Sequence, residues 1–191
     1  MPAAPAAPTG RRSIPVLETD RLRLRPFAPA DAPAVRRLAG HAAVAATTLE
    51  IPHPYPEGAA EGWIAGHAAA AAEGRTLTWA IERREGGVLM GAVTLRLVPA
   101  HARADLGYWL GVPYWNRGYT TEAVRRVVAY AFDEHCLHRL EARAMGRNVA
   151  SWRVMEKARL RREGVLRGYA RKGGAFEDIV VYALLRADLA Q

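Results

Sequence analysis

The sequence predicts a single domain of the α/β (α+β) class, with a run of antiparallel strands in the middle of the chain. Runs typical of strands recur between positions 77 and 112, and a long segment near position 125 repeats its apolar residues with helical spacing. Of the 191 residues, 50% are hydrophobic and 24% are charged, as in an ordinary packed protein. This length fits one domain.

The chain is expected to begin with a flexible tail, residues 1–15, followed by a single domain over residues 16–191. Prolines at every third position among alanines neither pack nor sustain a helix in this tail. Residues 21–25 alternate arginine with leucine, which predicts a half-buried strand that Pro26 ends. Asp31 then has the character of an N-cap, so a short helix follows it.

The next elements are a helix and three strands. A rigid loop with three prolines, residues 51–56, leads into a helix over residues 57–73. Residues 77–81 and 88–98 are strands separated by Glu-Gly-Gly at 85–87, which indicates a hairpin. Residues 106–112 form a further strand.

The clearest helix comes after these strands. Its apolar residues stand at positions 123, 124, 127, 128, 131 and 132, with charged residues on the other side. We then expect a strand at 139–144, a helix at 151–158 and, after a Gly-Gly turn at 173–174, a final strand at 179–185. The order describes a mixed α/β domain without an internal repeat.

The chain is strongly basic, which indicates the classes of partner that it could bind. The formal net charge is +8, and 25 of the 27 basic residues are arginine, in a sequence also rich in alanine. Such a charge suits a nucleic acid, a membrane surface or an anionic ligand, so its clusters at 21–25, 117–126 and 153–171 say more than its total. No segment predicts a membrane span or a secretory signal.

The cysteine and histidine content argues against disulfides and metal. Cys136 is the sole cysteine, which excludes an intramolecular disulfide and a cysteine cluster and suits the reducing cytoplasm. The six histidines show no metal-ligand spacing such as HExxH. We therefore expect a cytoplasmic protein with no metal.

Residues 115–122 join a strand to the amphipathic helix. The first amides of a helix lack intrahelical partners, and the helix dipole favours an anion there, so this turn is a candidate phosphate site. Gly118 lets the backbone approach a ligand, and Arg117 adds positive charge. The alternative is an ordinary turn in which Thr120 or Thr121 caps the helix.

Three segments in order carry a resemblance to a known family. They are Gly107-Tyr108-Trp109-Leu110, then Tyr114-Trp115-Asn116-Arg117-Gly118-Tyr119-Thr120-Thr121-Glu122-Ala123, then Asn148-Val149-Ala150-Ser151 with Glu156-Lys157. Together they resemble the RimJ/RimL branch of the GNAT N-acetyltransferase superfamily, over roughly residues 17–185. The resemblance implies a mostly antiparallel sheet of six or seven strands, about four flanking helices and a V-shaped splay where CoA enters.

The resemblance also implies a set of acetyl-CoA-binding residues. In the family, main chain of the splayed strand binds the pantetheine arm and the following turn, with the pattern Q/R-x-x-G-x-G/A, binds the pyrophosphate. The turn departs from the family at Asn116, where Gly is frequent, and at Thr120, where Gly or Ala is usual. The positions that match are Tyr108, Leu110, Trp115, Asn116, Arg117, Gly118, Tyr119, Thr120, Thr121, Asn148 and Ser151.

Catalytic roles follow less directly. Many GNAT enzymes place a tyrosine four positions beyond Ser151 to protonate the leaving thiolate, but Met155 stands there, so Ser151 becomes the general-acid candidate. Asn148 either contacts the CoA arm or simply caps a helix. The amine acceptor needs a general base, for which Glu50 and Asp105 are candidates.

The resemblance also implies an acceptor site at the proline-rich loop and the helix after it, where family members build the acceptor wall. His53, Tyr55 and Trp63 are the residues predicted to form its wall. The resemblance implies a primary amine as the acceptor, either the N-terminus of a ribosomal protein or a small molecule. We expect a monomer or a homodimer. Two alternatives remain open: a non-catalytic acetyl-CoA sensor, and a basic nucleic-acid-binding module, against which the lack of any HTH, RRM or zinc pattern argues.

Overall fold

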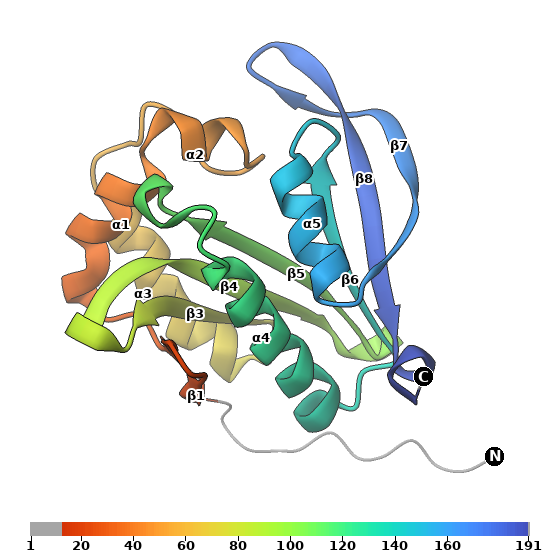
Figure 1. Ribbon diagram of the computed structural model, residues 1–191. Helices are drawn as coiled ribbons and strands as arrows, with labels where there is room; N and C mark the ends of the chain where they lie inside the picture. The colour runs from red at the N-terminus through yellow and green to blue at the C-terminus, as the bar shows by residue number, and fades with distance from the viewer. Residues whose placement is uncertain (1–12, 191) are drawn as a thin grey trace.

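An open sheet of eight strands forms the centre of the molecule in the computed structural model, which describes residues 13–190 (Figure 1). The strand order is β1-β2-β3-β4-β5-β6-β8-β7. All neighbours are antiparallel except β5 and β6, which are parallel. The strands are β1 (Leu17–Glu18), β2 (Leu22–Arg25), β3 (Thr76–Arg83), β4 (Val88–Val98), β5 (Arg103–Leu110), β6 (Arg139–Met145), β7 (Arg161–Lys172) and β8 (Ala175–Leu185).

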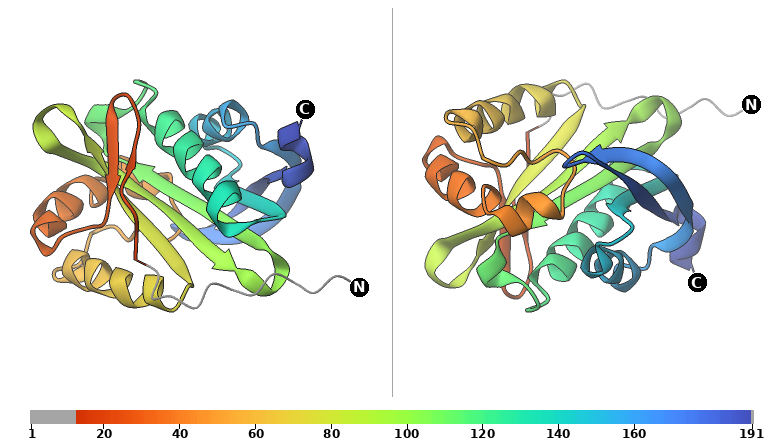
Figure 2. Two further views of the ribbon diagram at one scale, coloured as in Figure 1. Left: turned by 90° about the horizontal axis from the view of Figure 1, so that it is seen from below. Right: turned by 90° about the horizontal axis from the view of Figure 1, so that it is seen from above.

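Helices lie on both faces of this sheet, as the views from below and above show (Figure 2). On one face α4 packs over β2, β4 and β5 while α5 lies against β6 and β7, and on the other α1 and α3 cover β3 and β4. The helices are α1 (Ala32–Ala39), α2 (Ala42–Ala46), α3 (Ala59–Ala72), α4 (Tyr119–His135) and α5 (Val149–Lys157). No helix within residues 13–190 is long and apolar enough to cross a membrane.

Two hydrophobic clusters hold these layers together. The apolar stripe of α4, including Val124 and Phe132, packs with Trp79 and Val93 in the larger cluster. The neighbouring β3 residue, Ala80, belongs to the smaller cluster beneath α1 and α3. Successive strand residues point to opposite faces, so β3 is buried on both sides. Each large apolar side chain removed from water stabilises the fold by about 1.5–3 kcal/mol.

The parallel strands β5 and β6 separate after a short paired stretch (Figure 1). Only residues 103–106 of β5 pair with β6, at residues 139–142. Beyond that point residues 107–110 pair with β4 alone, and residues 143–145 pair with β8 alone. The sheet therefore opens as a V whose inner edges keep backbone groups available to a ligand.

This architecture confirms the predicted fold class and the V-shaped splay, with more elements than expected. The strand β7 and the short α2 and β1 were not predicted. In β7 nearly every residue is exposed, so the strand buries no face and shows no period-two pattern. Most of the predicted tail, residues 1–12, lies outside the described residues. Its last part contacts the core, because Trp79 Nε1 donates to the Pro15 carbonyl at 2.8 Å.

Candidate functional site

The turn before α4 presents open backbone at the mouth of the V. Asn116 and Gly118 both have left-handed conformations, with φ of 60° and 78°, and the first helical hydrogen bond runs from Glu122 N to Gly118 O. The amides of Tyr119 and Thr120 thus precede the helical ladder, where an anion binds well. Gly118 is the N-cap and has no side-chain cap bond, so neither Thr120 nor Thr121 caps this helix.

Side chains from the start of the chain hold this turn in place. Glu122 accepts from Thr19 Oγ1 at 2.6 Å and from Arg21 Nε at 2.7 Å. Arg21 Nη1 also donates to the Arg117 carbonyl at 3.1 Å, and its guanidinium lies 4.6 Å from the Tyr119 ring centroid. Burial raises the pKa of Glu122, but the hydrogen bonds from Thr19 and Arg21 outweigh it and hold the pKa below its usual value.

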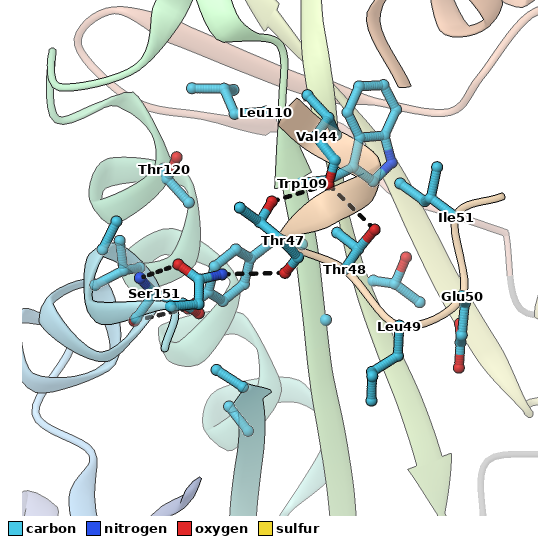
Figure 3. Close-up of a pocket in the computed structure, with 18 of the residues that line it drawn as sticks. Val44, Thr47, Thr48, Leu49, Glu50, Ile51, Trp109, Leu110, Thr120 and Ser151 are labelled. Carbon is cyan, nitrogen blue, oxygen red and sulfur yellow. Dashed lines mark hydrogen bonds between the residues drawn. The ribbon is translucent and has the colours of Figure 1, made fainter. Parts of the chain in front are cut away.

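A cleft of about 900 Å³ occupies the V and extends to both of its sides. Its walls come from β5, β6, the start of α4, α5 and the segment 47–51. Figure 3 shows Thr47 and Thr48 on one side of this cleft, with Thr120 and Ser151 on the other. The predicted site residues that line it are Glu50, Tyr55, Trp63, Asp105, Tyr108, Leu110, Trp115, Asn116, Gly118, Tyr119, Thr120, Thr121, Asn148 and Ser151.

Two predicted residues do not line the cleft. The Arg117 side chain is exposed, and its carbonyl is the acceptor for Arg21. The imidazole Nδ1 of His53 lies 3.1 Å from the Gly40 carbonyl in an exposed loop. Among the lining residues, Leu110 offers a partly used carbonyl, because Trp115 Nε1 donates to it at 2.7 Å.

Ser151 and Tyr108 meet across the cleft. The phenol oxygen of Tyr108 lies 2.8 Å from Ser151 Oγ and also donates to the Ser151 carbonyl at 3.1 Å. Burial raises the pKa of Tyr108 above its usual value although the Ser151 hydrogen bond lowers it, so the phenol stays protonated. Met155, by contrast, is fully buried in the core.

Asn148 has the geometry of a helix cap. Its Oδ1 accepts from Ser151 N at 3.2 Å, and its Nδ2 donates to the Thr47 carbonyl at 3.1 Å. The side chain therefore orients the turn that carries Ser151 and ties it to the opposite wall. Of the two roles that the sequence suggested for Asn148, this conformation has the helix-capping one.

The two candidate bases lie in different surroundings. Glu50 is 80% exposed at its side chain and pairs with Arg96 at 2.8 Å. Asp105 is half-buried at the base of the V, directly across the β5–β6 pair from Glu141. Burial, a hydrogen bond with Glu141 and the charge of Glu141 raise the pKa of Asp105, against the opposing charges of Arg103 and Arg143.

An aromatic wall borders the other side of the cleft. Tyr55 and Trp63 both line it. The Trp63 ring packs edge-on against Phe27, at 5.0 Å between centroids, and against His67, at 4.4 Å. Because Trp63 belongs to the packing of the smaller core cluster, this wall is rigid.

Two long-range contacts attach the segment 47–51 to the C-terminal half of the chain. One is the Asn148 bond to Thr47, and the other comes from the tip of the β7–β8 hairpin. There Lys172 Nζ donates to the Ile51 carbonyl at 2.9 Å and to the Leu49 carbonyl at 3.3 Å. Burial, together with the charge of Arg147, lowers the pKa of Lys172. The hairpin and the segment 47–51 thus bridge the V.

Sequence reasoning missed several residues of this site. Arg153 and Lys157 line the cleft from α5. Their spacing of four on a predicted helix was a signal that could have found them, because such residues share one face. Glu141 and Lys172 carried no such signal, because their partners are distant in sequence.

Comparisons with known proteins agree with this geometry. A family sequence model described as Acetyltransferase (GNAT) domain matches residues 21–161. The chain is 34% identical over 175 residues to the uncharacterized N-acetyltransferase YoaA of Bacillus subtilis (strain 168). The aligned region covers 91% of this chain and 98% of YoaA. YdaF of the same organism, for which ribosomal N-acetyltransferase activity is proposed, is 32% identical over 103 residues, 53% of this chain and 56% of YdaF.

A solved structure extends the likeness. Mycobacterium smegmatis RimJ in complex with CoA-disulfide has a TM-score of 0.82 and 26% identity, over 93% of this chain and 90% of that chain. These similarities confirm the resemblance to the RimJ/RimL branch that the sequence motifs indicated.

Proposed function

This chain belongs to the GNAT acetyltransferase family, and from that premise we propose that it transfers the acetyl group of acetyl-CoA to the N-terminal amine of a protein. It is an N-acetyltransferase, as its relatives are. The identity of the acceptor is the proposed part. The likeness to RimJ and YdaF supports a protein N-terminus, and we place the reaction in the cytoplasm, where proteins are synthesised.

One observation carries the proposal: open helix-start amides, a splayed strand pair and an oriented hydroxyl all face one cleft. A Cβ atom at Gly118 would have Arg21 Nη2, at 3.5 Å, as its one neighbour within 4 Å among the described residues outside the adjoining turn, so the turn leaves space for a phosphate. Arg153 and Lys157 add positive charge along α5. These residues fit an elongated anionic ligand such as CoA.

Acetyl-CoA supplies an acetyl group activated as a thioester. The segment 107–110 would bind the pantetheine arm, and the turn at 116–120 would bind the pyrophosphate. An amine attacks only when neutral, so a base must take a proton from it. We assign this role to Asp105 over Glu50, because Glu50 is exposed and paired with Arg96, whereas Asp105 has a raised pKa on the cleft floor.

Ser151 is assigned to the opposite end of the reaction. The Tyr108 phenol gives its one hydrogen to the Ser151 carbonyl and holds the serine hydroxyl at 2.8 Å, and in the reaction this hydroxyl would turn its hydrogen toward the departing sulfur. Asn148 holds the same turn through its cap bond. The neutral amine attacks, and as the new C–N bond forms and the C–S bond breaks, Asp105 takes the proton that the nitrogen loses and Ser151 gives its hydroxyl proton to the sulfur. Asp105 then releases its proton to water, and the serine oxygen takes one up from water, which restores both groups.

The acceptor enters, in this proposal, from the side of Tyr55 and Trp63. His53 would affect it indirectly, through the loop that it ties to Gly40. The rim of this side includes Leu49 and Tyr169, which are 41% and 58% exposed and both line the cleft. Exposed apolar residues at a cleft mouth suit a polypeptide that extends beyond its reacting amine.

The test measures thiol release from acetyl-CoA with a matched panel of amines. Peptides with a free N-terminus are compared with the same peptides N-terminally blocked but carrying one lysine, and with small-molecule amines. Thiol release only with the free N-terminus supports the proposal. Release only with small amines contradicts the assignment of a protein N-terminus as the acceptor. Acetyl-CoA binding without release from any amine would instead identify a sensor.

A further inference from the structure

Two carboxyl groups lie side by side at the point where the V opens. Asp105 and Glu141 are opposite each other in the parallel β5–β6 register, and this is the last pair but one before the strands separate. Arg103 Nη1 lies between them, 3.4 Å from Asp105 Oδ1 and 3.3 Å from Glu141 Oε1. One carboxyl faces the cleft, and the other is only 5% exposed.

The buried carboxyl has three arginine partners. Besides Arg103, Arg139 Nε donates to Glu141 Oε2 at 3.1 Å and Arg143 Nη2 donates to Glu141 Oε1 at 2.8 Å. Burial raises the pKa of Glu141, but hydrogen bonds from Asp105, Arg139 and Arg143 outweigh it, so its pKa lies below the usual value. Glu141 therefore stays ionised beside Asp105.

We propose that Glu141 is a positioning residue, which fixes the Asp105 carboxyl at the cleft floor and increases its affinity for the proton of the acceptor amine. This inference rests on the proposed function of Asp105. Two adjacent carboxyls resist double ionisation, because the charge of one disfavours the charge of the other. A base with a higher proton affinity removes the amine proton more readily at neutral pH.

Other charges facing Asp105 oppose or moderate this effect. From β4, Arg96 is its register partner, and the Arg96 charge is shared with Glu50. Arg103, on the same strand, and Arg143, on β6, both act on Asp105 through their charge. Arg139, also on β6, binds Glu141. The arginines favour an ionised Asp105, so the inference requires that carboxylates other than Asp105 engage them. Glu141 binds Arg103, Arg139 and Arg143, and Glu50 binds Arg96.

The test compares Glu141→Gln with a matched control, Glu163→Gln. Glu163 binds the same Arg139, at 2.7 and 2.6 Å, and the structure gives it no contact with Asp105. Two readouts apply: the pH profile of kcat/KM with the amine acceptor, and the ¹³C titration of the Asp105 carboxyl by NMR in the free protein. We expect Glu141→Gln to lower both midpoints by about one pH unit, and Glu163→Gln to leave both nearly unchanged.

The NMR titration separates this inference from the proposed function. An Asp105 midpoint that Glu141→Gln leaves unmoved would overturn the inference, whether or not the protein acetylates any amine. If Glu141→Gln does not fold, the unmodified protein decides: a midpoint above about 3.9, with two steps shared with Glu141, supports the inference. A single step at or below that value overturns it.

Discussion

The hydroxyl of Ser151 and the phenol of Tyr108 form a hydrogen bond of 2.8 Å that joins α5 to the splayed end of β5. The two residues are 43 positions apart in the chain. The single phenol hydrogen is donated to the Ser151 carbonyl at 3.1 Å, so the phenol oxygen accepts the hydrogen of the serine hydroxyl in the 2.8 Å bond. The bond also makes the serine hydroxyl a fixed group in the cleft, which a catalytic hydroxyl requires.

Replacement of Ser151 by Ala should lower kcat with little change in acetyl-CoA binding. General-acid assistance is worth about 10²–10⁴-fold, and we expect a loss of about 10- to 1,000-fold. Steady-state rates and an acetyl-CoA titration of the same preparation provide the measurement. A fully active Ser151→Ala enzyme would remove the serine from the mechanism.

Replacement of Tyr108 by Phe should cost less than the Ser151→Ala change, because it removes only the group that orients the serine. The two effects should not add, since each mutation breaks the same hydrogen bond. A double-mutant cycle in kcat measures this coupling. Additive losses would mean that the phenol acts independently of Ser151, for example in binding the CoA arm.

Asn148→Ala should destabilise the protein by about 0.5–2 kcal/mol, because the mutation removes the cap of α5. The bond to the Thr47 carbonyl is lost as well, so the segment 47–51 keeps only the Lys172 contact to the C-terminal half of the described residues. Urea unfolding measures the effect, with Asn148→Ser as a control that keeps a capping oxygen. Equal stability of the Ala variant and the unmodified protein would contradict a capping role.

Acetyl-CoA should raise the melting temperature. A ligand that binds only the folded protein adds about 2.7 kcal/mol at 100-fold over Kd. Gly118→Glu should abolish the shift, because it places bulk and negative charge where the phosphates are proposed to bind. Desulfo-CoA is the matched control, and it should still stabilise the protein. A melting temperature that saturating acetyl-CoA does not move would count against this use of the cleft.

Acid should destabilise the protein through His67. Neither ring nitrogen has a hydrogen-bond partner among the described residues, and burial lowers the His67 pKa to about 4. In the unfolded chain the pKa is about 6.5, so the unfolded state takes up the proton first. The contribution of His67 to the free energy of unfolding should therefore be constant above about pH 6.5. It should decrease as the pH falls from about 6.5 to about 4.

The measurement for His67 is urea unfolding between pH 4.5 and pH 7.5. His67→Phe keeps an aromatic ring against Trp63 and Phe27 but cannot take up a proton. The difference in stability between this variant and the unmodified protein should change with pH over that window. Parallel pH profiles would contradict the prediction, because they would mean that His67 has the same pKa in the folded and the unfolded protein.

Local patterns in the sequence were sufficient to identify most of the fold. The apolar stripe of α4 shows the helical period that burial of one face imposes, and β3 and β4 are short apolar runs separated by a Gly-Gly turn. The left-handed turn at Asn116 and Gly118 is also local. These segments, with their order along the chain, were enough to predict the class, the V and the family.

Elements that bury few apolar residues were not predictable in this way. The edge strand β7 buries almost nothing, and only its pairing with β8 makes it a strand. Its turn at Gly173 and Gly174 was visible, but the residues before it show no alternation. For this reason the contact of Lys172 with Ile51 at the cleft was not predicted either, because it joins residues 121 positions apart.

The sequence by itself therefore determined the fold class, the family and the residues at the start of α4, because each depends on neighbours in the chain. Only the tertiary structure decided which side chains share the cleft. It set Glu141 beside Asp105 through the parallel pairing of β5 and β6, and Tyr108 against Ser151 across the V. Strand order and register create these contacts, and a charged residue leaves no periodic signal of the distant partner that it will meet.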